Sequence, residues 1–215
     1  MIAALLATAL AGGARFDLLT AEDGWKDLGN RSSSYGRIDV RSRDIDGLTC
    51  FAGSVVADVG VDALVRVTGH MVRSPEWSSA RLPISEELER SGSSFVLFQL
   101  YDVPNWTLAA DRYWVLRGSV SRGGDGAGTY RYERVDPARY PRVAEVLTEH
   151  DGAIEPPTNF GQWTFAPGEG GTRVSYRGCS AFGGSIPSSI QSWLGLQQLP
   201  TMMEELIDAA RSGRY

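Results

Sequence analysis

The sequence predicts an α+β domain in which an antiparallel β-sheet packs against one long C-terminal helix. Strand-like segments separated by hairpin-turn signals fill much of the chain, and the Pro-Gly-Glu-Gly-Gly turn within 161–176 is the clearest of them. From about Ser185 to Arg211, apolar residues instead recur at steps of three or four, as on one face of a helix. Ser185 suits an N-cap and Pro187 suits the first helical turn. The chain of 215 residues, 42% apolar, is long enough for one core, so we expect a single domain.

Residues 1–14 form an apolar run that ends in small residues, and Ala9-Leu10-Ala11 fits the small-x-small rule for signal peptidase. The run is too short to span a bilayer. No Lys or Arg precedes Arg15, which departs from the basic start of most signal peptides. We expect a signal peptide and a secreted or periplasmic protein whose domain spans residues 16–215. The alternatives are a buried N-terminal helix and a cytoplasmic protein.

The first half of the domain reads as strands followed by an inserted helix. Residues 16–29 form a helical or irregular lead-in anchored by Trp25, and strands are expected at 35–40 and 48–57 around a turn at Asp44–Gly47. Residues 58–73 then carry apolar side chains at helical spacing, before Pro75 stops the pattern.

The second half returns to strands. Residues 95–101 are too apolar for a strand with one solvent-exposed face, so either both faces are covered or one face lines a cavity. Strands follow at 111–120 and 129–135, and the glycine run between them lacks the Gly-Lys-Ser/Thr ending of a phosphate loop and reads as a hairpin tip. Residues 137–151 predict a helical insertion that ends before Pro156-Pro157.

Composition and motifs argue against several classes of function. The formal charge of −5 and the single lysine, Lys26, argue against nucleic acid as a partner and against tight adhesion to anionic membranes, so any membrane contact should be transient. His70 and His150 lie outside any metal-ligand spacing with the two cysteines, and we expect no metal and no cofactor. Catalytic motifs such as Gly-x-Ser-x-Gly are missing, so we expect that the protein is not an enzyme. We also expect it to be a monomer.

Polar residues within the apolar strands are candidates for ligand contact, because a buried polar group needs a partner. They could equally satisfy one another or face solvent, and the apolar stripe of the C-terminal helix could be plain core. The candidate cavity residues are Phe98, Gln99, Tyr101, Arg112, Trp114, Arg117, Trp163 and Tyr176 from the strands, with Ile190, Trp193, Met203 and Leu206 from the helix.

The C-terminal motifs resemble those of START lipid-transfer domains. The resemblance rests on the Trp strand at 161–167, the Thr-Arg-Val-x-Tyr strand at 171–176 and the Gly-Gly-Ser-Ile-Pro corner at 183–187. Upstream, Trp77 and the strand around Arg112 are similar to family features, although Tyr113 stands where the family has Asp, and residues 136–155 look like an insertion.

The resemblance implies a helix-grip fold, with a curved sheet around the C-terminal helix and an internal hydrophobic cavity. It also implies non-catalytic binding and transfer of a phospholipid, sterol or fatty-acyl ligand. The alternatives are a polyketide cyclase or aromatase of the same superfamily, in which cavity Arg and Tyr polarise a carbonyl, and an interaction module whose cavity is filled by side chains.

The resemblance further implies that Cys50 and Cys179 lie on neighbouring antiparallel strands. The start of one strand then meets the end of the other, within reach of a disulfide. Such a bridge persists in an oxidising compartment, so it and the signal peptide should both be present or both be absent.

Overall fold

The computed structural model describes residues 13–103, 109–181, 183 and 188–215, with side chains of the last segment described from residue 196. Within these residues, nine antiparallel strands form a single sheet in the order β1-β2-β3-β9-β8-β7-β6-β5-β4. Their bounds are β1 Lys26–Ser33, β2 Gly36–Ile45, β3 Leu48–Ala57, β4 Ile84–Ser91, β5 Ser94–Tyr101, β6 Arg112–Arg122, β7 Gly128–Arg134, β8 Thr158–Gly168 and β9 Gly171–Ala181.

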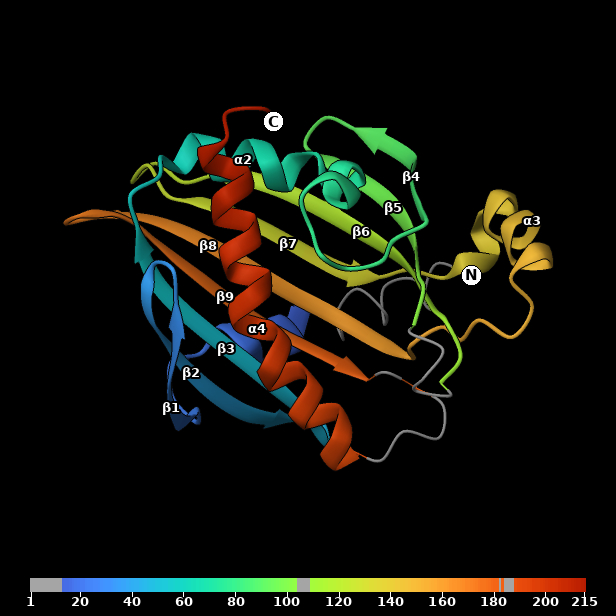
Figure 1. The fold of residues 1–215 in the computed structure, drawn as a ribbon, viewed down its shortest axis with the longest axis horizontal. Helices are drawn as coiled ribbons and strands as arrows, with labels where there is room; N and C mark the ends of the chain where they lie inside the picture. Colours follow the sequence, from blue (N-terminus) through green and yellow to red (C-terminus); the bar gives the residue numbers. More distant parts are fainter. Residues whose placement is uncertain (1–12, 104–108, 182, 184–187) are drawn as a thin grey trace.

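The C-terminal helix α4 (Ser188–Arg211) crosses one face of this sheet, as the helix-grip prediction requires (Figure 1). It contacts β1, β3 and β9 and the shorter helix α2 (Val61–Gly69). Met203 is fully buried against Gly53 of β3, where a β-carbon would lie 2.7 Å from the Met203 sulfur. The absent side chain at Gly53 therefore lets α4 approach the sheet closely.

Shorter helical elements form within or next to the two segments predicted as helical insertions. Residues predicted as one helix at 58–73 form α2 and then the 3₁₀ helix η1 (Met71–Glu76), which contains Pro75. Helix α3 (Pro141–Glu149) lies in the predicted 137–151 insertion. The turn between β2 and β3 falls at Asp46 and Gly47, which both have positive φ, as a type I′ hairpin turn needs.

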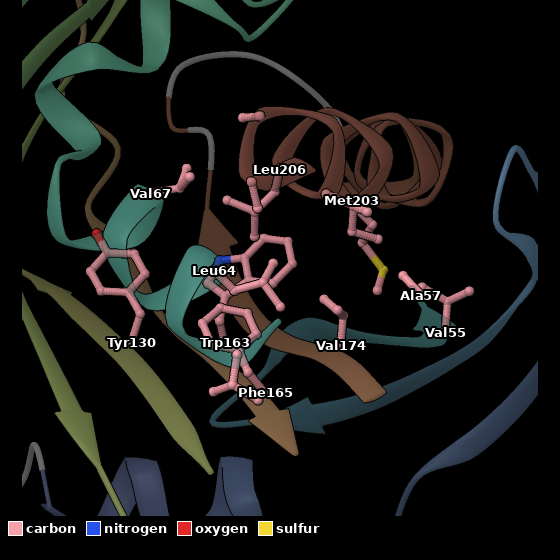
Figure 2. Close-up of a cluster of buried hydrophobic side chains, with 14 of the residues drawn as sticks. Val55, Ala57, Leu64, Val67, Tyr130, Trp163, Phe165, Val174, Met203 and Leu206 are labelled. Atoms are coloured by element: carbon pink, nitrogen blue, oxygen red, sulfur yellow. The ribbon is translucent and has the colours of Figure 1, made fainter. Parts of the chain in front are cut away.

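The main core lies between the sheet, α2 and α4 (Figure 2). Trp163 and Phe165 of β8 and Val174 of β9 come from the sheet, and Leu64 of α2 and Leu206 of α4 close over them. The alternation of side chains along each strand assigns these residues to one face.

The opposite face of the sheet carries two smaller clusters. A helix at residues 13–20 lies behind the sheet in Figure 1 and buries Phe16 and Leu19 against Phe160. Beneath it Cys50 of β3 and Cys179 of β9 are directly paired and joined by a disulfide, with a Cα separation of 4.3 Å. The predicted pairing of the two cysteines is confirmed.

The second cluster on this face brings Val143 and Val146 of α3 onto Val96, Phe98 and Val115 of β5 and β6. The insertion therefore serves as a cover for the outer face of the sheet. Without it, the apolar side chains of β5 on that face would be exposed, which explains why residues 95–101 are apolar on both sides.

Two strands were not predicted. β1 lies where part of an irregular lead-in was expected, and β4 fell between predicted elements. Both are edge strands whose residues are largely exposed or half-buried, so neither shows the alternation of apolar and polar residues that marks a strand.

Candidate functional site

A cavity of about 650 Å³ lies between the sheet and α4. Its lining combines strands β3 and β5 to β9 with η1, the loop that follows η1, and α4. The side chains are mostly apolar or aromatic, including Phe51, Met71, Trp77, Leu82, Leu97, Tyr101, Trp114, Leu116, Tyr130, Tyr132, Trp163, Tyr176, Leu199, Met202 and Leu206. A volume of this size matches pockets that hold drug-sized ligands, roughly 300 to 1,000 Å³.

Several residues predicted from sequence do line this cavity. They are Gln99, Tyr101, Trp114, Trp163, Tyr176 and Leu206. Five of these come from strands and share one face of the sheet, the side of α4. Gln99 pairs with Trp114 and Trp163 pairs with Tyr176 across neighbouring strands, and Tyr101 is two residues from Gln99.

Phe98 and Arg117 were wrong as cavity residues. Phe98 is adjacent to Gln99 and therefore faces the other side of the sheet, where it is fully buried under α3. Arg117 is three residues from Trp114 and so also points outward, where it lies beside Tyr140. Sequence hydrophobicity could not separate the two faces of β5 because both are covered.

Arg112 and Met203 also lie outside the lining. Arg112 is buried, and its guanidinium donates hydrogen bonds to the carbonyls of Ala110 and Gly183, while burial lowers its pKa. Met203 packs into the core over Gly53, while its neighbour Met202 lines the cavity. The side chains of Ile190 and Trp193 lie outside the described residues.

One polar feature of the cavity is a pair of tyrosines. The hydroxyls of Tyr132 on β7 and Tyr176 on β9 are 2.8 Å apart and hydrogen bonded, and burial raises the pKa of both phenols. Sequence analysis singled out Tyr176 and missed Tyr132. The alternation Tyr130-Arg131-Tyr132 in a predicted strand was the available signal.

A second polar group joins α4 to the loop after η1. The Glu205 carboxylate accepts a hydrogen bond of 2.8 Å from the Ser79 backbone N–H and one of 3.2 Å from the Ser78 hydroxyl. Nearby, the Gln99 amide donates to the hydroxyls of Ser74 and Ser85. Glu205 therefore ties the 78–79 segment to α4 at the cavity wall, and sequence analysis did not identify it.

Basic side chains do not contribute to the described lining, whose one charged residue is Glu205. The parts of the chain outside the described residues contain no Lys, Arg or His, and so add no basic side chain. Within the described ranges, no group of three or more His, Cys, Asp or Glu side chains is placed to hold a metal ion.

This architecture defines the class: a helix-grip protein with a largely apolar cavity under its C-terminal helix. Solved structures of that class are similar to it. A STAR-related lipid transfer protein from Xanthomonas axonopodis is 28% identical with a TM-score of 0.66, over 89% of this chain and 98% of that one. Human StAR-related lipid transfer protein 5 aligns with a TM-score of 0.71 at 14% identity, over 100% and 99% of the two chains.

The fold is also shared with an enzyme. The Zhui aromatase/cyclase from Streptomyces sp. R1128 aligns with a TM-score of 0.51 at 12% identity, over 77% of this chain and 95% of that one, a likeness of fold alone. No protein-family model and no curated protein matches the sequence. The structural comparisons confirm the resemblance seen in the C-terminal motifs: the chain has the helix-grip fold of START-type lipid transfer proteins.

Proposed function

We propose that this protein binds a hydrophobic ligand in the cavity under α4 and transfers it without changing it chemically. The observation that carries the proposal is the 650 Å³ cavity, whose wall is built largely from aromatic and aliphatic side chains. Burying apolar ligand surface there is favourable by roughly 25 cal/mol per Å² removed from water. The proteins with a similar fold from Xanthomonas axonopodis and human carry lipid transfer in their names, which supports a lipid as the ligand.

A phospholipid, a sterol or a fatty-acyl compound would each supply such an apolar body. Hydrophobic pockets separate similar chains only weakly, by about 1 to 3 kcal/mol per methylene. The polar groups in the cavity, and not its apolar walls, should therefore decide between ligand classes.

A cyclase or aromatase is the second candidate. Its support is the structural similarity to the Zhui enzyme and the pair of neutral phenols inside the cavity, which could polarise a carbonyl of a polyketide. Extraction of the purified protein with organic solvent, followed by mass spectrometry, separates the two: a recovered intact lipid supports the carrier. Turnover of a polyketide chain by ligand-free protein would support the enzyme instead.

A variant with a filled cavity makes the extraction specific. Leu116 of β6 lines the cavity, so L116W should reduce the recovered lipid several-fold by occupying its space. Ser121 lies on the same strand, is exposed, and faces the other side by strand parity, so S121W adds the same side chain outside the cavity. Equal lipid recovery from L116W and S121W would show that the lipid does not bind in this cavity.

We further propose a secreted or periplasmic monomer that contacts membranes transiently. The Cys50–Cys179 disulfide supports an oxidising compartment, and the charge of −5 disfavours lasting adhesion to anionic lipid. In the described part of the chain, no helix is long and apolar enough to cross a bilayer. Most of the apolar segment 1–14 lies outside the described residues, so N-terminal sequencing of the protein from its native compartment is the test of cleavage.

A further inference from the structure

The Tyr132–Tyr176 pair is incomplete as a hydrogen-bonding group. One hydroxyl donates to the other across 2.8 Å, which uses one of the two protons. For the remaining O–H, the described residues provide no acceptor within hydrogen-bonding distance. A donor removed from water without a hydrogen-bond partner is destabilising. Because both tyrosines line the cavity, this O–H is placed to donate to an oxygen of a ligand bound there.

The backbone beneath the pair leaves room for the two hydroxyls. Gly161 of β8 and Gly178 of β9 lie directly opposite each other in the sheet. A β-carbon would lie 2.5 Å from the Tyr132 hydroxyl at Gly161 and 2.1 Å from the Tyr176 hydroxyl at Gly178. Either methyl group would displace the pair. The position of the Tyr132–Tyr176 pair therefore depends on two facing glycines as well as on the tyrosines themselves.

The surroundings of the pair are apolar and carry no positive charge. The Trp163 ring lies 4.8 Å from the Tyr176 ring, and the Tyr130 ring lies 5.8 Å from that of Tyr132. No basic side chain lines the described cavity, and the undescribed segments contain none. Burying a carboxylate or phosphate there without a cation costs several kcal/mol. The raised pKa values keep both phenols neutral at physiological pH, so they remain donors to an uncharged acceptor.

We propose that Tyr132 and Tyr176 recognise one uncharged oxygen, a hydroxyl or a carbonyl, on an otherwise apolar ligand, so that the cavity selects neutral lipids over anionic ones. The inference rests on the proposed ligand-binding function and narrows its ligand class. The apolar walls hold the body of the ligand, and the tyrosine pair sets its orientation.

The test uses the purified full chain and probes that share a body but differ in charge. Cholesterol is compared with cholesteryl sulfate, and hexadecanol with palmitate, each delivered from cyclodextrin at pH 7.5. We expect at least one neutral probe to bind about tenfold or more tightly than its anionic partner. A tenfold ratio of Kd values corresponds to about 1.4 kcal/mol of binding free energy.

Substitutions then test whether the two tyrosine hydroxyls cause the preference for the neutral probe. The double substitution Y132F/Y176F should weaken binding of the neutral probe about 3- to 10-fold, which matches the net value of one hydrogen bond, and should leave the anionic probe unchanged. Tyr113 of β6 lies outside the cavity, on the opposite face of the sheet where its ring packs against Phe98, so Y113F is the matched control and should bind as the wild type does. Circular dichroism checks that each variant is folded, and the comparison of probes on the wild type needs no variant.

The outcomes separate this inference from the function on which it rests. Equal binding of neutral and anionic probes, or equal losses in Y113F and Y132F/Y176F, overturns the tyrosine assignment while ligand binding stands. If no probe binds, the lipid extracted from the wild type decides, because a neutral lipid supports the inference and an anionic one overturns it. Absence of both probe binding and extracted lipid overturns the proposed function as well.

Discussion

Breaking the Cys50–Cys179 disulfide should lower the free energy of unfolding by about 5 kcal/mol. The two cysteines are 129 residues apart, so the bridge closes a loop over more than half of the chain. In the chain-entropy treatment, a loop of this size removes about 17 cal/mol/K from the unfolded chain, or about 5 kcal/mol at 25 °C. Because domains are stable by only about 5 to 15 kcal/mol, the loss would be a large share of the total.

The position of the bridge adds a kinetic expectation. Cys50 and Cys179 are 0% and 1% exposed, and the helix at 13–20 covers them with Phe16 and Leu19. A reductant therefore reaches the sulfurs only after that helix detaches or the sheet opens. Native protein should resist dithiothreitol for much longer than protein held in denaturant.

Urea unfolding followed by fluorescence measures the effect. Oxidised wild type is compared with C50A/C179A, each with and without reductant, since the variant contains no cysteine and should not respond to it. A difference below about 1 kcal/mol between oxidised wild type and the variant would refute the loop-entropy reasoning. Two reactive thiols per chain in denatured, unreduced protein from its native compartment would rule out the bridge itself.

Three further substitutions probe other contacts. M203D places a carboxylate at a fully buried core position and should unfold the protein or cost several kcal/mol, seen as a lower urea midpoint; a stable M203D would show that α4 is not packed on Gly53. E205Q removes the charge that binds the Ser79 N–H and should speed ligand exchange, measured by stopped-flow fluorescence, with E169Q in the exposed turn between β8 and β9 as the control. E86Q breaks the hydrogen bonds to Arg142 of α3. The hydrogen bonds to Arg142 lower the pKa of Glu86, so the stabilisation that they give is present above about pH 4.5 and is lost as the pH falls through the lowered pKa. The free energy of unfolding of E86Q should therefore be lower than that of wild type at pH 7, by no more than about 1 kcal/mol. At low pH the two free energies should be equal.

Much of the fold could be predicted from the sequence because the signals are local. The predicted strand at 48–57 matches β3, the glycine run after β6 is a hairpin tip, and the long apolar-striped segment forms α4. Turn residues and hydrophobic periodicity act over a few residues, so one chain suffices to see them. The edge strands β1 and β4 escaped prediction because their exposed positions accept almost any polar residue.

The cavity residues could be predicted only in part. Gln99 and Trp163 were placed correctly, because aromatic and polar residues within apolar strands are unusual enough to notice. Tyr132 and Glu205 were missed, since each acquires its role from a partner more than 40 residues away in the sequence.

The sequence by itself determined the α+β class, the single long C-terminal helix and the START resemblance of its last strands. Only the tertiary structure decided which side of each strand meets the cavity. Phe98 and Gln99 are neighbours in sequence, yet one is buried under α3 and the other lines the cavity. The physical reason is that successive side chains on a strand point to opposite faces, and in this sheet both faces are covered, so hydrophobicity alone does not distinguish them.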